Sequence, residues 1–305
     1  MAAPRTAPDP VAPGALDHGA EPPTAARRPS GERFPTPGRV AGYAVLVLAA
    51  AALLLPFFWM VSSSLKTSNT VFSTPVTWLP DVPRWRNYLE IWRVSDMLVW
   101  LKNTVFLSLV VTFLQLFTGS FAAYGFAKAR FPGRNLLFVL YVGTIAVPWQ
   151  AYMIPQFIFM SEIGLTDTLW SIVALQAFGA FGVFLMRQYY ATIPDELCEA
   201  ARVDGLSEYG IYFRIMLPLS VPALASLALL TLVTTWNDYL GPLIYLRDPD
   251  LWTIQLGLKS FVSEYSAEHA LIMTGSVLSV LPVAVVFLLG QKYFVQGVAT
   301  SGMKG

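Results

Sequence analysis

Residues 42–65 read GYAVLVLAAAALLLPFFWMVSSSL and contain no Asp, Glu, Lys or Arg. A helix rises about 1.5 Å per residue, and roughly 20 apolar residues cross a bilayer core about 30 Å thick, so this stretch is long enough to span a membrane. Five similar stretches follow, with charged residues only near their ends. The six predicted spans are Gly42–Leu65, Asn103–Ala127, Leu136–Met160, Leu169–Met186, Pro222–Leu240 and Ala270–Lys292. The sequence therefore predicts an all-α, polytopic membrane helix bundle.

The composition agrees with a membrane protein and excludes several other classes. The 305 residues are 55% hydrophobic and 13% charged, and the mean hydropathy is +0.55. A soluble domain carries roughly 25% charged residues, so this chain has too few to cover a water-exposed surface. A net charge of +1 lacks the basic excess that a nucleic-acid-binding protein needs. One cysteine and two histidines exclude a disulfide framework and a conventional cysteine- or histidine-rich metal centre.

The first 37 residues differ from the rest of the chain. They hold nine of the 22 prolines and show no apolar period. Such a segment cannot bury enough apolar surface to offset the entropy lost on ordering, and it lacks the apolar region of a cleaved signal peptide. We expect a disordered, proline-rich cytoplasmic tail over residues 1–37 and one six-span transmembrane domain over residues 38–305.

Lysine and arginine predict the orientation of the spans, because these residues are enriched in cytoplasmic loops. With the tail inside, 13 of the 20 Lys and Arg residues lie on the cytoplasmic side and seven on the other. We therefore expect a multi-pass protein of a bacterial plasma (inner) membrane, in contact with lipid, with both termini in the cytoplasm.

The predicted spans offer the chain no energy source of its own. Ion-driven carriers place ionisable side chains inside the membrane, and none lies well inside these spans. The sequence also lacks the phosphate-binding G-x-x-x-x-G-K-[ST] loop and any nucleophile–base cluster, so we expect no enzyme activity and no catalytic residue. Active transport would need an energy-supplying partner. An ATP-independent channel or facilitator for small solutes is the alternative.

The connection between predicted spans four and five carries the most specific pattern. It reads TIPDELCEAARVDGLSEYGIYFRIMLPLSVP over Thr192–Pro222. Thr192 and Asp195 suit a capping arrangement, and Pro194 suits the first turn of a helix. Gly205 can adopt the left-handed conformation that ends this helix.

A second short helix should follow Gly205. Ser207 can cap it, and we expect it to end before Pro218. On the first helix, Leu197, Ala200 and Ala201 share one face at helical spacing. The segment is therefore predicted to form a helix–glycine–helix hairpin, whose small residues allow another protein to approach closely.

This segment resembles the EAA motif of permeases from bacterial ABC importers, E-A-A-x-x-x-G-x(9)-I-x-L-P. The residues that carry the resemblance are Glu199, Ala200, Ala201, Asp204, Gly205, Ile215, Leu217 and Pro218. The complete pattern at its spacing is far more specific than a glutamate followed by two alanines.

Other stretches resemble the maltose-type (MalG-like) carbohydrate permeases. They are Pro56–Trp59 with Ser64–Lys66, Ala122–Ala127 before Phe131–Gly133, Trp236–Tyr239, and the C-terminal Gly297–Gly305. The ending departs from the family's G-[LV]-x-x-G-x-V-K-G pattern at Ser301 and Met303. The resemblance covers approximately residues 38–305.

The resemblance implies a type I importer in which this chain pairs with a second, homologous permease subunit. Two cytoplasmic ABC ATPase subunits would use ATP and Mg²⁺, while this chain holds no cofactor or metal. The hairpin would be the coupling helix that enters a cleft of an ATPase, and Lys304 and Gly305 would reach toward the ATPase pair. An extracellular solute-binding protein would deliver a carbohydrate or related solute.

Four residues are weaker candidates for the solute path. Trp149 and Gln150 follow Pro148, which is expected to kink its span, and both side chains can contact a solute. Asn237 and Asp238 lie at the outer end of the fifth predicted span. An interfacial helix end explains this second pair equally well.

Overall fold

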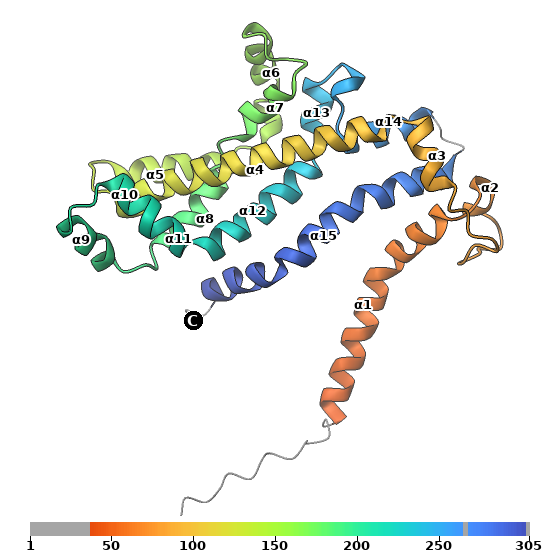
Figure 1. Ribbon diagram of the computed structural model, residues 1–305, viewed down its shortest axis with the longest axis horizontal. Coiled ribbons are helices and arrows are strands. Elements are labelled where there is room, and N and C mark those ends of the chain that lie inside the picture. The colour runs from red at the N-terminus through yellow and green to blue at the C-terminus, as the bar shows by residue number, and fades with distance from the viewer. Residues whose placement is uncertain (1–36, 265–267, 303–305) are drawn as a thin grey trace, which may run out of the picture. The chain divides into compact units, whose positions relative to one another are not determined.

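The computed structural model describes residues 37–264 and 268–302. Its contacts divide the chain into two units, Met1–Leu53 and Leu54–Gly305, and each is considered by itself. Of the predicted tail, residues 1–36 lie outside the described residues. The described residues form helices and connections without a strand (Figure 1).

The helices of the first half are α1 (Pro37–Ser64), α2 (Ser68–Val71), α3 (Asn87–Val94), α4 (Met97–Lys128), α5 (Arg134–Gly143), α6 (Met153–Glu162), α7 (Leu169–Gln176) and α8 (Ala180–Tyr190). Those of the second half are α9 (Asp195–Val203), α10 (Glu208–Ile211), α11 (Leu217–Leu219), α12 (Val221–Trp236), α13 (Leu240–Tyr245), α14 (Ile254–Glu264) and α15 (His269–Gly302). Short 3₁₀ turns lie at η1 (Thr144–Ala146), η2 (Trp149–Ala151) and η4 (Pro249–Leu251), and a π turn, η3, covers Tyr212–Met216.

Four described helical stretches are long and apolar enough to cross a membrane. They are Gly38–Ser64, Met97–Lys128, Leu169–Tyr190 and His269–Gln291. A fifth crossing results if Glu208–Leu219 and Val221–Trp236, which meet at 78°, are one bent span. The all-helical membrane architecture is therefore confirmed, at four or five candidate spans among the described residues.

The third predicted span is not one helix. Within Leu136–Met160 the chain forms α5 and η1, breaks at Val147 and Pro148, and resumes through η2 into α6. Proline has no N–H to donate and disfavours helical backbone in the residue before it. Val147 accordingly adopts an extended conformation, with φ −84° and ψ 113°. Only Arg134–Ala146 remains as a shorter apolar helix.

Helix α4 is the central element of the second unit. It packs along α8 and α12, and it also meets α7 and α14 (Figure 1). The approach to α8 is close because a Cβ on Gly119 would lie 3.5 Å from the backbone carbon of Gly182. Small residues permit such backbone contact between membrane helices, where dispersion between packed atoms replaces a hydrophobic driving force. The contact fixes the position of α8, and with it the segment that follows.

Helix α15 covers the other side of α12. The Trp236 indole Nε1 donates a hydrogen bond of 3.1 Å to the carbonyl oxygen of Ser279, and both groups are buried. At the far end of α15, the Thr274 hydroxyl donates to the carbonyl oxygens of Ala270 and Ser64. These bonds satisfy polar groups that would otherwise be costly to bury.

Candidate functional site

The 192–222 segment forms two helical pieces separated by Gly205. Helix α9 ends in a Schellman motif: the Leu206 N–H donates to the Ala201 carbonyl at 3.0 Å, and the Gly205 N–H donates to the Arg202 carbonyl at 3.1 Å. Gly205 has φ +83°, the left-handed conformation that the sequence suggested. The Ser207 hydroxyl then accepts a hydrogen bond from the Gly210 N–H at 3.2 Å and caps α10.

Two local expectations for this segment are wrong. The Thr192 hydroxyl does not cap α9; it donates to the Tyr189 carbonyl at the end of α8, and Pro194 occupies the N-cap position. The second helical piece does not end before Pro218 but continues through η3 and α11 to Leu219. The π turn of η3 shifts the hydrogen-bond register just before the proline, which allows Pro218 to sit within helical backbone. The 78° bend to α12 follows at Ser220.

The two faces of α9 have different environments. Cys198 and Ala201 are buried against η3, and the Cys198 Sγ lies 3.7 Å from the Met216 Sδ. Burial raises the pKa of the Cys198 thiol. Leu197 and Val203 are exposed, the latter at 87%. Of the three residues predicted to share one face, Ala201 is thus buried, whereas Leu197 and Ala200 are exposed.

Exposed apolar side chains lie along the outer side of α9. Leu197, Ala200 and Val203 recur every three residues, and we call them the α9 strip. Of the predicted coupling residues, Glu199, Ala200, Asp204, Gly205 and Pro218 are exposed, Ile215 and Leu217 are half-buried, and Ala201 is buried. The predicted residues thus lie in one segment, in which Ala201 packs against the protein and most of the others are accessible to a partner.

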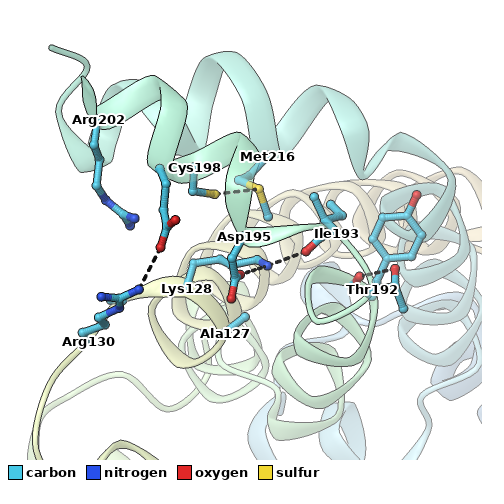
Figure 2. Close-up of polar contacts among 12 residues, drawn as sticks. Ala127, Lys128, Arg130, Thr192, Ile193, Asp195, Cys198, Arg202 and Met216 are labelled. Carbon is cyan, nitrogen blue, oxygen red and sulfur yellow. Dashed lines mark hydrogen bonds and ion pairs between the residues drawn. The ribbon is translucent and has the colours of Figure 1, made fainter. Parts of the chain in front are cut away.

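Ion pairs attach α9 to the end of α4. The Lys128 side chain is 4% exposed, and its Nζ contacts the Asp195 Oδ1 at 2.5 Å and the Ile193 carbonyl oxygen at 2.6 Å (Figure 2). Lys128 holds the pKa of the Asp195 carboxyl below its usual range by its hydrogen bond and its charge. Arg130 pairs with Glu199 at 2.9 Å, with both side chains largely exposed.

A third ion pair lies within the segment. The Arg202 Nε contacts the Glu208 Oε1 at 2.7 Å, across the Gly205 turn. This hydrogen bond raises the pKa of the Arg202 guanidinium. Lys128 was not among the predicted site residues, because it lies 67 positions before its partner Asp195. Its only signal was a lysine at the cytoplasmic end of a predicted span.

A second candidate region is a cavity of about 1030 Å³ between α4, α6, α7, α8, α12 and α13, whose largely apolar wall carries a group of polar side chains. Its polar lining comprises Gln115, Gln156, Gln176, Thr231, Thr234, Thr235, Asn237 and Asp238, and its aromatic lining Trp149, Tyr152, Phe181, Tyr239 and Tyr245. Three of the four solute-path candidates, Trp149, Asn237 and Asp238, therefore line one cavity. Gln150 is exposed and does not line it.

Hydrogen bonds connect the polar side chains of this cavity. The Gln176 amide donates to the Asp238 Oδ2 at 2.7 Å and accepts from the Thr235 hydroxyl. The Gln115 side-chain amide donates to the backbone carbonyl of Gln176 at 2.7 Å and accepts from the Thr231 hydroxyl. The glutamines were not among the predicted site residues, because each sits alone in an apolar run. Their signal was an uncharged polar residue on a predicted span, which must find a partner inside the bundle.

Two other predictions concern metals and the chain end. Among the described residues, no group of three or more His, Cys, Asp or Glu side chains is placed to hold a metal ion. Lys304 and Gly305, the predicted C-terminal ATPase contacts, lie outside the described residues.

Comparisons with known proteins add to this geometry. The family described as "Binding-protein-dependent transport system inner membrane component" matches residues 115–300, which include both the cavity and the 192–222 segment. The chain is 34% identical over 270 residues to the arabinooligosaccharides transport system permease protein AraQ of Bacillus subtilis (strain 168), a match that covers 88% of this chain and 96% of the relative.

Two further proteins are similar over most of their length. The lactose transport system permease protein LacG of Rhizobium radiobacter is 36% identical over 259 residues, covering 85% of this chain and 94% of the relative. A chain of a bacterial ABC transporter involved in the import of the acidic polysaccharide alginate superposes with a TM-score of 0.76 at 27% identity. That match covers 86% of this chain and 99% of the solved one.

Proposed function

This chain belongs to the family of binding-protein-dependent transport system inner membrane components, and we propose that it is the permease subunit of an ATP-driven ABC importer that moves a carbohydrate or related solute inward. The family forms the membrane component of such importers, and the ATPase is a separate subunit, so the chain is not an enzyme. The names of relatives that transport arabinooligosaccharides and lactose support a carbohydrate as the solute.

Six crossings with both termini in the cytoplasm follow from this proposal. Helices α1, α4 and α15 supply three, and α7 with α8 supplies another. The broken α5–α6 segment crosses as the third span and α12 as the fifth. Irregular backbone at membrane depth is tolerated where it is buried in protein or lines a cavity. Trp149 in η2 and Gln156 within α6 line the cavity, which supports a crossing by this broken segment.

We assign coupling to the ATPases to the 192–222 segment. The main support for this role is the exposure of the α9 strip. Its apolar edge is exposed beside the acidic Glu199, while the opposite face is locked onto η3 and α4. A small, rigid, partly apolar knob of this kind suits insertion into a groove of a partner. ATP-driven closure of two ATPases would move the knob, and the contacts with Lys128 would pass that motion to α4. Lys304 and Gly305 are proposed as further ATPase contacts.

Other partners and the solute path complete the proposal. A second, homologous permease subunit pairs with this chain in the lipid bilayer, and an extracellular solute-binding protein delivers the solute, in line with the family's description. The cavity forms part of the solute path, with Trp149, Asn237 and Asp238 in its wall. Gln150 is assigned to the approach to the cavity.

Reconstitution tests this function. The chain is assembled with its second permease and ATPases in lipid vesicles, and uptake of labelled lactose or arabinotriose is measured with the cognate solute-binding protein outside. We expect uptake only when both ATP and the binding protein are present. Uptake that proceeds without ATP would instead identify a channel or facilitator.

A matched pair of variants tests the coupling segment. Ala200→Trp places a bulky side chain in the exposed α9 strip, and we expect it to abolish uptake while the permease pair still assembles. Ala50→Trp makes the same enlargement at another exposed site, on α1 and outside the 192–222 segment. Normal uptake by Ala200→Trp would contradict docking through the α9 strip.

A further inference from the structure

The wall of the cavity contains one acidic side chain. Of the described residues that line it, Asp238 is the single carboxylate and none is Lys, Arg or His. Its Oδ2 accepts from the Gln176 amide at 2.7 Å, and its Oδ1 accepts from the Gly241 N–H at 3.1 Å. Both bonds have Asp238 as acceptor, as suits a carboxylate.

Hydrogen bonds hold the glutamine side chains that surround Asp238 in fixed orientations. Gln176 bridges Thr235 and Asp238, and Gln115 bridges Thr231 and the Gln176 backbone. A Cβ on Gly179 would lie 2.9 Å from the Gln115 Oε1, so the glycine leaves room for this amide. The amides and hydroxyls of this wall are held in place and offer hydrogen-bond donors and acceptors without net charge. The hydroxyl groups of a sugar need partners of both kinds.

The opposite part of the cavity is aromatic and is also fixed. The Trp149 indole Nε1 donates to the Gln156 Oε1 at 2.8 Å, and the Tyr245 hydroxyl donates to the same oxygen at 3.3 Å. These bonds orient two rings that, with Tyr152 and Tyr239, present apolar faces with polar tips. Rings of this kind pack against the C–H faces of a sugar while its hydroxyl groups bond to amides.

An anionic solute would meet an unfavourable field in this cavity. Proteins recognise carboxylates and phosphates with Arg or Lys, whose charge-assisted bonds offset the loss of water. Here such a solute would be desolvated beside the carboxylate of Asp238, and like charges placed together across a contact cost several kcal/mol. The acidic polysaccharide named for the similar solved transporter is a solute of the kind this cavity disfavours.

From this charge distribution we infer that the cavity selects uncharged, hydroxyl-rich carbohydrates and rejects uronates and phosphate esters. The inference rests on the proposed importer function and narrows its solute class. The glutamines Gln115 and Gln176 determine recognition of hydroxyl groups, and Asp238 excludes anions.

Direct binding to the assembled importer tests the inference. The full complex in nanodiscs, without the binding protein, is titrated with four probes and followed by saturation-transfer NMR, which detects weak binding. Lactose and arabinotriose are the neutral probes; digalacturonate and sn-glycerol 3-phosphate are the anionic ones. We expect the neutral probes to bind at least tenfold more tightly than the anionic ones, and Gln176→Leu to remove their signal.

Two variants change the charge of the cavity. Asp238→Asn should lower the ratio of the affinity for neutral probes to that for anionic probes at least threefold. Thr234→Lys, which adds a cation at an exposed position of the wall, should lower it further. Asp250→Asn removes a carboxylate that does not line the cavity and should leave the preference unchanged. The Thr234→Lys result tests the inference even where Asp238→Asn fails to fold.

The outcomes separate this inference from the proposed function. Anionic probes that bind as tightly as neutral ones, with a signal lost in Gln176→Leu, would overturn the inference. ATP-dependent uptake of digalacturonate would do the same while leaving the importer function intact. Failure of every probe to show ATP-dependent uptake would overturn the function itself.

Discussion

Gly205 carries the turn between α9 and α10 by its backbone conformation alone. Its φ is +83°, and a Cβ added there would meet nothing within 4 Å. Any effect of substitution therefore comes from backbone strain and not from steric contact. L-residues with a Cβ lose roughly 1–2 kcal/mol in the left-handed region, whereas asparagine tolerates it better.

We expect Gly205→Val to uncouple the importer and Gly205→Asn to preserve coupling. The β-branched valine disfavours this conformation, so the Schellman motif should open and the α9 strip should lose its fixed position. The measurement is ATP hydrolysis and solute uptake on the same vesicles: the valine variant should hydrolyse ATP with uptake reduced about tenfold or more. Equal uptake by the two variants would show that the conformation of Gly205 has no part in coupling.

Individual residues also show how far sequence can predict a site. The residues proposed for coupling follow one another within 192–222, so the local pattern and a family resemblance locate them together. The cavity residues Gln115, Gln176 and Asp238 come from three distant segments. Only the packing of α4, α7 and α12 brings them together, and no local pattern encodes that arrangement.

Besides the packing of Cys198 and Ala201, α9 is held to the bundle by ion pairs, of which the one with Lys128 is the more buried. This lysine is almost fully buried and bonds to both Asp195 and the Ile193 carbonyl, whereas the Arg130–Glu199 pair is exposed. Hydrogen bonds to charged groups contribute roughly 1.5–3 kcal/mol, and exposed ion pairs about 0–1 kcal/mol. The two pairs join the same elements and are therefore a natural comparison.

We expect Lys128→Met to raise local opening of α9 by about tenfold or more, and Arg130→Met to change it less than about fivefold. Hydrogen exchange of the amides of 195–203 in nanodiscs measures this opening. Because Lys128 lowers the pKa of Asp195, the contribution of this pair is fully present above about pH 4 and is lost as the pH falls through the lowered pKa. Exchange that responds equally to both variants would contradict the dominant role of Lys128.

Among the helices, the predicted spans agree with the structure where an uninterrupted apolar run is enough to define the helix. Helices α1, α4 and α15 coincide closely with the first, second and last predicted spans. The third predicted span contained Pro148, whose kink the sequence indicated, but hydropathy does not report where backbone hydrogen bonds stop. The path past Pro218 was missed for a related reason, since a π turn depends on the hydrogen bonds of neighbouring residues.

For the whole molecule, the broken α5–α6 segment decides the topology. If it crosses the membrane, Val82 and Val203 lie on opposite sides, because three crossings separate them. If it enters and leaves on one side, only two crossings separate them and the two residues share a side. Both side chains are well exposed, at 76% and 87%, so both positions are accessible to a reagent.

We expect single cysteines at these positions to be labelled from opposite sides. Cys198 is the only cysteine, and Cys198→Ala provides a thiol-free background with little change in volume. In cells that lack the ATPase subunits, which would otherwise cover Val203, a membrane-impermeant maleimide should label Val82→Cys and spare Val203→Cys. Inverted vesicles from these cells should reverse the pattern. Labelling of both positions from one side would refute the six-span topology and the cytoplasmic position of α9 relative to the outer loop.

The interruption at Val147 and Pro148 also bears on how cells make this protein. Both residues are exposed in the isolated chain, and a bilayer supplies no hydrogen-bonding groups to an interrupted helix. A copy without its assembly partner would therefore present an unshielded defect to lipid. Cellular abundance should follow the supply of the companion subunit, with orphaned copies removed by membrane proteolysis, so this break would enforce subunit stoichiometry during biogenesis.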